Sequence, residues 1–320
     1  SGRPPSHERD RRVTRPPPAA PESRPLFSGL TPNARGMLAM TAASMLFVCS
    51  DALSKVVSKS WTVGQMMAVR GIFAILLALS VTLITGAGRR LPMIGRPVLI
   101  VRSMLEGSVA LTFLYALSLM PLADLTSILM LSPLAITIVS IFAFKEVVGW
   151  RRWSAILAGF VGMQLVVQPG GAASAAPNYA FAASLGLCSV LGVAMRDTLT
   201  RRLPSDIPSV VITVAASIGS CLAGFLLAGF QGWNAFAWWP LVACLAAAII
   251  VTAGNLLLIL ACRGVDLSVV APYRYGAVVW SIAMGMMVFG DVPNGLSFVG
   301  MAIITASGLY PMHRERLRRR

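Results

Sequence analysis

Apolar residues fill long stretches of the chain, and Gly, Pro or Arg separates each stretch from the next. A helix rises about 1.5 Å per residue, so about twenty apolar residues cross the roughly 30 Å hydrocarbon core of a bilayer. The pattern predicts helices over 36–58, 62–84, 97–119, 122–144, 151–168, 178–200, 207–229, 238–262, 266–289 and 293–312. The predicted fold class is therefore an all-α integral membrane protein with ten transmembrane helices.

Basic residues are distributed unevenly among the loops and span ends. One alternate set contains ten of them: Arg89, Arg90, Arg96, Lys145, Arg151, Arg152, Arg196, Arg201, Arg202 and Arg263. The other set contains two, Lys55 and Lys59. Because cytoplasmic loops carry the excess of Lys and Arg, we expect both termini and the basic loops in the cytoplasm. The expected location is the cell inner (plasma) membrane, with the lipid bilayer as the surrounding medium.

Much of the net charge of +15 lies at the two ends of the chain. Residues 1–33 are rich in Pro and Arg and contain no apolar run, which predicts a disordered cytoplasmic tail. Inert disorder and contact with anionic lipid headgroups both remain open for it. Residues 313–320 form a second basic cytoplasmic tail. This distribution follows membrane topology, so no nucleic-acid partner is expected.

The two halves of the chain resemble each other. The stretch 122–146 aligns without gaps on 267–291, which places Glu146 opposite Asp291. Each half has five predicted spans, an odd number, so the second half enters the membrane from the opposite side. The sequence therefore predicts two inverted five-helix repeats, 34–170 and 177–312. Inverted repeats with a binding site between them are typical of secondary transporters.

A family resemblance lies at the end of the fourth span and in the fifth. The run LSPLAITIVSIFAFKE, with Pro133 inside it, and the following WRRWSAILAGFVGMQLVVQPG resemble the EamA-type branch of the drug/metabolite transporter superfamily. The resemblance covers about 34–312. It implies ten helices, cytoplasmic termini and a central cavity, with the fifth and tenth helices at the periphery. The second half departs from the pattern, because Val278 stands opposite Pro133.

Within this family, the run VRSMLEGSVALTFLYALSLMPLADLTSILMLSPL is similar to carriers associated with riboflavin and S-adenosylmethionine uptake. The resemblance implies uptake of riboflavin or a similar planar, vitamin-like metabolite by alternating access. An S-adenosylmethionine carrier and an exporter of amino acids or other metabolites are the alternatives within the superfamily. A passive facilitator or channel is the alternative from another class, since facilitation needs no coupling group.

Charged residues inside the predicted spans are candidates for substrate binding or gating, because burying them in a membrane is costly. Counting along the helices places Asp51 and Arg70 nearer the outer surface and Arg102, Glu106, Asn255 and Arg274 nearer the cytoplasmic surface. Arg102 and Glu106 are separated by four residues, so they share one helix face.

We expect two exchanging closures, Asp51 with Arg70 on the outer side and Glu106 with Arg274 on the inner side. Alternating access suits buried ion pairs, whose net contribution to stability is small. The alternative is that these groups are structural, with Lys55 and Arg102 extending to nearby headgroups. Four other acidic residues near span ends are expected to cap helices or face water: Asp124, Asp197, Asp206 and Asp266.

Lys55 and the five deep charges named above (Asp51, Arg70, Arg102, Glu106 and Arg274) sum to +2, which favours an anionic or neutral polar substrate over a cation. Three tyrosines could stack on a planar ring while their hydroxyls fix its orientation: Tyr115, Tyr273 and Tyr275. Packing between helices is the alternative for Tyr115 and Tyr275.

The Cys and His residues predict neither a metal site nor a cofactor. The five Cys all lie in apolar spans without CxxC spacing, and both His lie in the polar tails. A membrane-embedded enzyme would need convergent His, Cys or paired carboxylates, so no catalytic residue is assigned. Asp51 or Glu106 could carry a coupling proton. Small residues on the fifth and tenth spans are expected to pack within one chain, with a homodimer seam as the alternative.

Overall fold

The structure is a computed structural model that describes residues 32–144, 150–167, 178–200, 203–204, 206–262 and 271–319. Throughout these ranges every regular element is helical. The elements are α1 (Pro32–Val57), α2 (Val63–Ile84), η1 (Ala87–Gly95), α3 (Pro97–Leu119), α4 (Leu122–Leu129), α5 (Ser132–Phe144), α6 (Trp150–Val167), α7 (Tyr179–Thr200), α8 (Ser209–Gln231), α9 (Trp238–Cys262), η3 (Ala271–Tyr275), α11 (Gly276–Met284), η4 (Gly285–Phe289) and α12 (Gly295–Arg319). The predicted all-α membrane fold is confirmed.

Six of these helices are long and apolar enough to cross a bilayer: α1, α2, α3, α7, α8 and α9. Shorter apolar stretches lie at 122–136, 157–166 and 295–307. The first 31 residues of the predicted tail 1–33 lie outside the described residues. At the other end, α12 continues to Arg319, so a helix extends through most of the second predicted tail.

The fourth and ninth predicted spans are not continuous α-helices. The fourth divides into α4 and α5 at Met130–Leu131, just before Pro133, which has no N–H and disfavours helical geometry in the residue before it. The ninth changes from the 3-10 segment η3 to α11 at Gly276 and then to the π-helical η4. Positions 131 and 276 are equivalent in the alignment of 122–146 with 267–291, so the two interruptions coincide.

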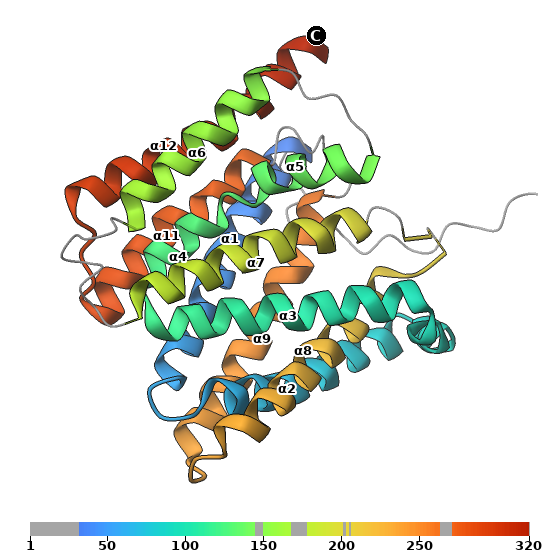
Figure 1. Ribbon diagram of the computed structural model, residues 1–320. Helices are drawn as coiled ribbons and strands as arrows, with labels where there is room; N and C mark the ends of the chain where they lie inside the picture. The colour runs from blue at the N-terminus through green and yellow to red at the C-terminus, as the bar shows by residue number, and fades with distance from the viewer. Residues whose placement is uncertain are drawn as a thin grey trace, which may run out of the picture.

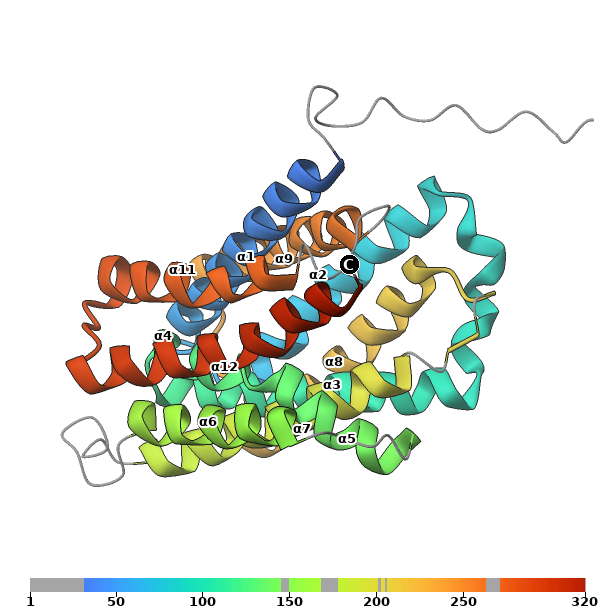
Figure 2. The same cartoon turned by 90° about the horizontal axis from the view of Figure 1, so that it is seen from above.

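The helices pack as two bundles and two pairs. The first bundle consists of α1, α9 and α11, and the second bundle consists of α3, α4, α5 and α7, with α4 also packed against α11 of the first bundle. Figure 2 shows the two bundles on opposite sides of the molecule. The pairs α2–α8 and α6–α12 lie along two opposite edges (Figure 1). Each bundle thus combines helices from both halves of the chain.

The α6–α12 pair is held by direct backbone contact at two glycines. A Cβ atom on Gly162 would lie 2.8 Å from the carbonyl oxygen of Gly300, and one on Gly300 would lie 2.5 Å from the carbonyl oxygen of Gly162. Only a residue without a side chain allows this approach. The predicted packing of small residues within one chain is confirmed for this pair.

We expect Gly162→Ala and Gly300→Ala each to destabilise the protein by about 1–3 kcal/mol, because the added methyl group forces two backbones apart. The measurement is the melting temperature of the purified protein in detergent. Gly229→Ala on α8 is the control, since its Cβ would meet no atom within 4 Å. Equal melting temperatures for all three variants would contradict a close α6–α12 contact.

Candidate functional site

Arg70 lies near Asp51 but does not pair with it directly. Its Nη1 atom donates a hydrogen bond of 2.8 Å to Ser54 Oγ on α1. The Arg70 charge acts on Asp51 through space, and no direct ion pair joins these two described residues. Ser54 also donates to the backbone carbonyl of Ser50 at 2.9 Å. The prediction of a direct pair between Asp51 and Arg70 is therefore wrong, because the hydrogen-bond partner of Arg70 is the Ser54 hydroxyl.

Glu106 forms the centre of an ion cluster between α3 and α7, here called the Glu106 cluster (Arg102, Glu106, Arg196, Asp197 and Thr200). Glu106 Oε2 lies 3.0 Å from Arg102 Nη2, and Oε1 lies 3.0 Å from Arg196 Nη1. Arg196 Nη2 lies 2.8 Å from Asp197 Oδ1. Arg102 Nε donates to Thr200 Oγ1 at 3.4 Å. The cluster ties two helices of the second bundle to each other.

The prediction that Glu106 pairs with Arg274 is wrong in this structure. The shared face of Arg102 and Glu106 is confirmed, but the second cation is Arg196 from α7. Arg274 lies exposed on η3. Local sequence pattern does not reveal the α7 partner, because Arg196 resembles the other basic residues at span ends and Asp197 resembles a helix cap. Their shared pairing could be found only once α3 and α7 were known to pack together.

A second cluster, not anticipated from the sequence, lies at the opposite end of α3; it is here called the Lys55 cluster (Lys55, Met120, Asp124, Tyr179 and Asp291). Lys55 Nζ donates to the Met120 carbonyl at 2.9 Å and lies 3.5 Å from Asp291 Oδ2. Tyr179 donates its hydroxyl to Asp124 Oδ2 at 2.7 Å. The alternative that Lys55 extends to headgroups is wrong, since its side chain is only 13% exposed.

Asp124 also differs from its expected role. It is 5% exposed and bonded to Tyr179, so it neither faces water nor acts as a simple helix cap. Asp206 does face water, in a pair with Arg96 at 2.9 Å, as expected. The Arg96 hydrogen bond lowers the pKa of Asp206 below the usual range for an aspartate. Asp266 lies outside the described residues.

The three candidate tyrosines have different surroundings. Tyr115 packs edge-on against Phe181, with ring centroids 6.4 Å apart, which favours the packing role for it. Tyr273 is exposed on η3. Tyr275 is 5% exposed, and its buried hydroxyl has no hydrogen-bond partner among the described residues. An unsatisfied buried hydroxyl is costly and rare, so Tyr275 is the tyrosine that needs a functional explanation. Asn255 is half-buried on α9.

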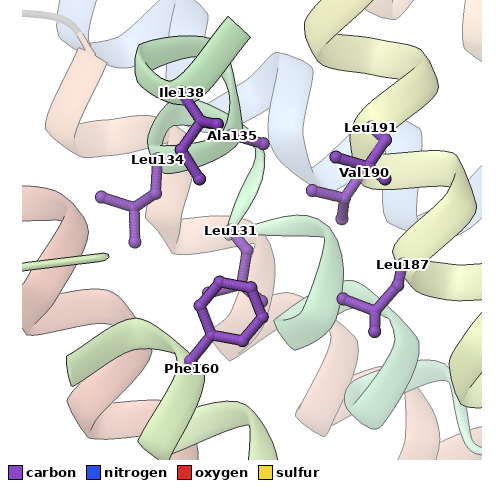
Figure 3. A pocket seen from close by; sticks show the side chains of 8 residues that line it. All are labelled: Leu131, Leu134, Ala135, Ile138, Phe160, Leu187, Val190 and Leu191. Atoms are coloured by element: carbon purple, nitrogen blue, oxygen red, sulfur yellow. The ribbon is translucent and has the colours of Figure 1, made fainter. Parts of the chain in front are cut away.

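An apolar pocket of about 140 Å³ lies between α5, α6 and α7. Figure 3 shows its lining, in which Leu131, Leu134 and Phe160 face Leu187, Val190 and Leu191 across the opening. Every lining side chain is apolar, and Phe160 and Leu191 are largely exposed on their helices. This lining suits a hydrocarbon group, and it includes none of the charged or tyrosine residues predicted to bind substrate. Within the described residues, no three His, Cys, Asp or Glu side chains gather as a metal site.

Comparison with known proteins supports the family resemblance. Residues 34–168 match the model of the EamA-like transporter family, so the resemblance predicted from the sequence is confirmed. The chain is 28% identical to a riboflavin transporter of Vibrio cholerae, over 57% of this chain and 59% of that protein. It is 25% identical to the pseudopaline exporter CntI of Pseudomonas aeruginosa, over 85% of this chain and 94% of that protein. It is 24% identical to an S-adenosylmethionine uptake transporter of Rickettsia bellii, over 63% and 67%.

One crystal structure of a protein is similar over 88% of this chain and 98% of that chain, with a TM-score of 0.54 and 20% identity. This similarity supports the fold alone. The chain is thus a multi-pass membrane protein that resembles membrane transporters, and its relatives include an uptake transporter and an exporter.

We expect Glu106→Gln to destabilise the protein by roughly 2–3 kcal/mol, because two guanidinium groups that are less than one fifth exposed lose their shared carboxylate. The readout is the melting temperature in detergent. Asp206→Asn is the matched control, since it breaks a pair whose side chains are 40% and 44% exposed. No measurable change is expected there. An unchanged melting temperature for Glu106→Gln would contradict the role of the cluster in holding α3 to α7.

Proposed function

We propose that the chain is a secondary transporter that moves a small polar metabolite across the inner membrane by alternating access. The observation that carries the proposal is the pair of bundles, each built from both halves of the chain. Exchanging the halves maps α1, α9 and α11 onto α7, α3 and the broken α4–α5 helix. It also maps α2–α8 and α6–α12 onto themselves. Two related bundles that rock around a site between them are the expected machinery of such a carrier.

The first helices of the two halves are also similar in sequence. The run 50–55, SDALSK, aligns with 196–201, RDTLTR, at a separation of 146 residues. In this register Ser54 corresponds to Thr200, and each hydroxyl receives a hydrogen bond from an arginine, Arg70 and Arg102 respectively. These parallels support the proposal that 34–170 and 177–312 are inverted five-helix repeats.

The proposed orientation places both termini in the cytoplasm, because the basic loops cluster on that side. Arg274 then lies on the cytoplasmic half of the ninth span, exposed. A guanidinium at this depth is costly against lipid, so we expect water or substrate beside it. Asp51 is the remaining candidate for a coupling proton, because Glu106 is already held between two arginines.

For the substrate, we propose uptake of riboflavin or a similar planar vitamin-like compound. The relative with the highest identity given above is a riboflavin transporter. Metabolite export is the second candidate, since the match to an exporter covers 85% of this chain. The S-adenosylmethionine carrier ranks below both, because the identity to that relative is the lowest of the three, at 24%.

The first test is riboflavin counterflow in proteoliposomes that contain the purified protein. We expect saturable uptake that is accelerated when riboflavin is preloaded, because a carrier exchanges bound substrate faster than it returns empty. A channel would show neither saturation nor acceleration. A thermal-shift series with riboflavin and S-adenosylmethionine measures binding independently of direction. A shift with S-adenosylmethionine alone would overturn riboflavin as the substrate.

The second test concerns Tyr275, whose free hydroxyl we assign to substrate binding. Tyr275→Phe should leave the melting temperature unchanged or slightly higher, because it removes an unsatisfied buried group. It should raise KM for riboflavin about tenfold, the effect of one lost hydrogen bond of about 1.4 kcal/mol. Tyr179→Phe is the matched control, since it deprives Asp124 of a donor and should lower the melting temperature. An unchanged KM in Tyr275→Phe would remove Tyr275 from the binding site.

A further inference from the structure

Lys55 lies at the border between the two bundles. It is carried by α1 of the first bundle, yet its Nζ atom donates at 2.9 Å to the carbonyl of Met120, which ends α3 of the second bundle. Two groups just beyond α11 hold the ammonium in place: Asp291 Oδ2 at 3.5 Å and the Phe289 ring, whose centroid is 4.7 Å away. Phe289 ends η4, which continues directly from α11, and the Asp291 N–H donates to the Gly285 carbonyl at 3.1 Å, so both groups are attached to the first bundle. Beside this contact α4 packs against α11, which also joins the two bundles.

The second bundle presents a carboxylate to the same ammonium. Asp124 on α4 is almost fully buried, and the hydroxyl of Tyr179 on α7 fixes its orientation. Both Asp124 and Asp291 act electrostatically on Lys55. The ammonium is therefore attracted by one carboxylate that moves with it and by another that belongs to the opposite bundle.

We propose that Lys55 is the latch of the outer closure, and that it takes the role which the sequence assigned to Asp51 and Arg70. Its bond to Met120 and its attraction to Asp124 hold the outer ends of the two bundles together. Asp291 is a positioning residue that keeps Lys55 paired when the bundles separate. The inference rests on the proposed alternating-access function.

The arrangement keeps the cost of opening low. Leaving a charge unpaired inside a protein costs several kcal/mol, but neither charge is abandoned when the bundles part. Lys55 keeps Asp291 and the Phe289 ring, and Asp124 keeps the Tyr179 hydroxyl. Opening then breaks one hydrogen bond, one longer-range attraction and the packing of α4 against α11. The Glu106 cluster differs, because both of its helices belong to the second bundle and it stays intact as the bundles move.

The experiment measures access to a cysteine beneath the latch. Ala123, next to Asp124 on α4, is 2% exposed and serves as the position of the reporter cysteine in a chain whose five native Cys are replaced by Ala. Right-side-out and inside-out membrane vesicles are treated with a membrane-impermeant maleimide, and the rate of labelling is recorded. This readout needs no substrate, so it stands even if riboflavin is not carried.

The proposal predicts opposite changes in labelling rate for substitutions of Lys55 and of Asp291. Lys55→Met should label several-fold faster than the parent in right-side-out vesicles, because the bond to Met120 is gone. Asp291→Asn should label more slowly than the parent, because Lys55 then has no partner to keep when the bundles part. If Lys55 and Asp291 only stabilised the fold, both variants would loosen the protein and both would label faster than the parent. Lys59→Met is the control, since Lys59 lies 5.4 Å from the same Phe289 ring and forms no ion pair with Asp291.

Asp124→Asn supplies a second test should Lys55→Met fail to fold. It removes the attraction across the border but retains an amide oxygen for Tyr179, and it should accelerate labelling. Unchanged labelling in both Lys55→Met and Asp124→Asn would overturn the latch, as would faster labelling in Asp291→Asn. Acceleration confined to inside-out vesicles would overturn the outer assignment. If the labelling rates change as predicted but riboflavin shows no counterflow, riboflavin is not the substrate, and the proposal that Lys55 is the latch still stands.

Discussion

The cost of burying charge in a medium that cannot solvate it governs this structure. Most helices that carry the clusters are apolar enough to cross a bilayer, and the charged groups of the two clusters are paired. Glu106 neutralises Arg102 and Arg196 between α3 and α7, while Asp291, just after η4, neutralises Lys55 on α1. Because the strong pairs lie inside the bundles, each bundle can act as a rigid unit. The border between the bundles is held by the hydrogen bond from Lys55 to Met120 and by the packing of α4 against α11.

Helix α3 contributes to both the Glu106 cluster and the Lys55 cluster. It carries the Glu106 cluster toward one end and reaches the Lys55 cluster at Met120, where it ends. Fourteen residues separate Glu106 from Met120, which is about 21 Å along a helix. A shift of α3 relative to α1 would therefore change the contact of Lys55 with Met120, while the Glu106 cluster joins α3 to α7 and does not involve α1. The glycine contact of α6 with α12 lies at one edge of the molecule, away from this border (Figure 1).

The sequence predicted what depends on local pattern and missed what depends on contact between distant helices. Span positions followed from hydrophobic length, and the shared face of Arg102 and Glu106 followed from helical periodicity. The interruption before Pro133 was not predicted, although a proline inside an apolar span is a sufficient local signal for it. Lys55 and Asp291 are 236 residues apart, so no spacing rule could join them. Arg274 was matched with Glu106 by depth alone, and depth does not say which helices are neighbours.

The 26 residues of α1 form a rod of about 39 Å, with Lys55 close to one end. If this rod pivots about its middle by roughly ten degrees, its tip travels about 3 Å while Ser44 near the centre hardly moves. Such a displacement is as large as the 2.9 Å reach from Lys55 to Met120. The lever geometry means that a tilt too small to disturb the packing at the centre of α1 is enough to release the contact at its tip.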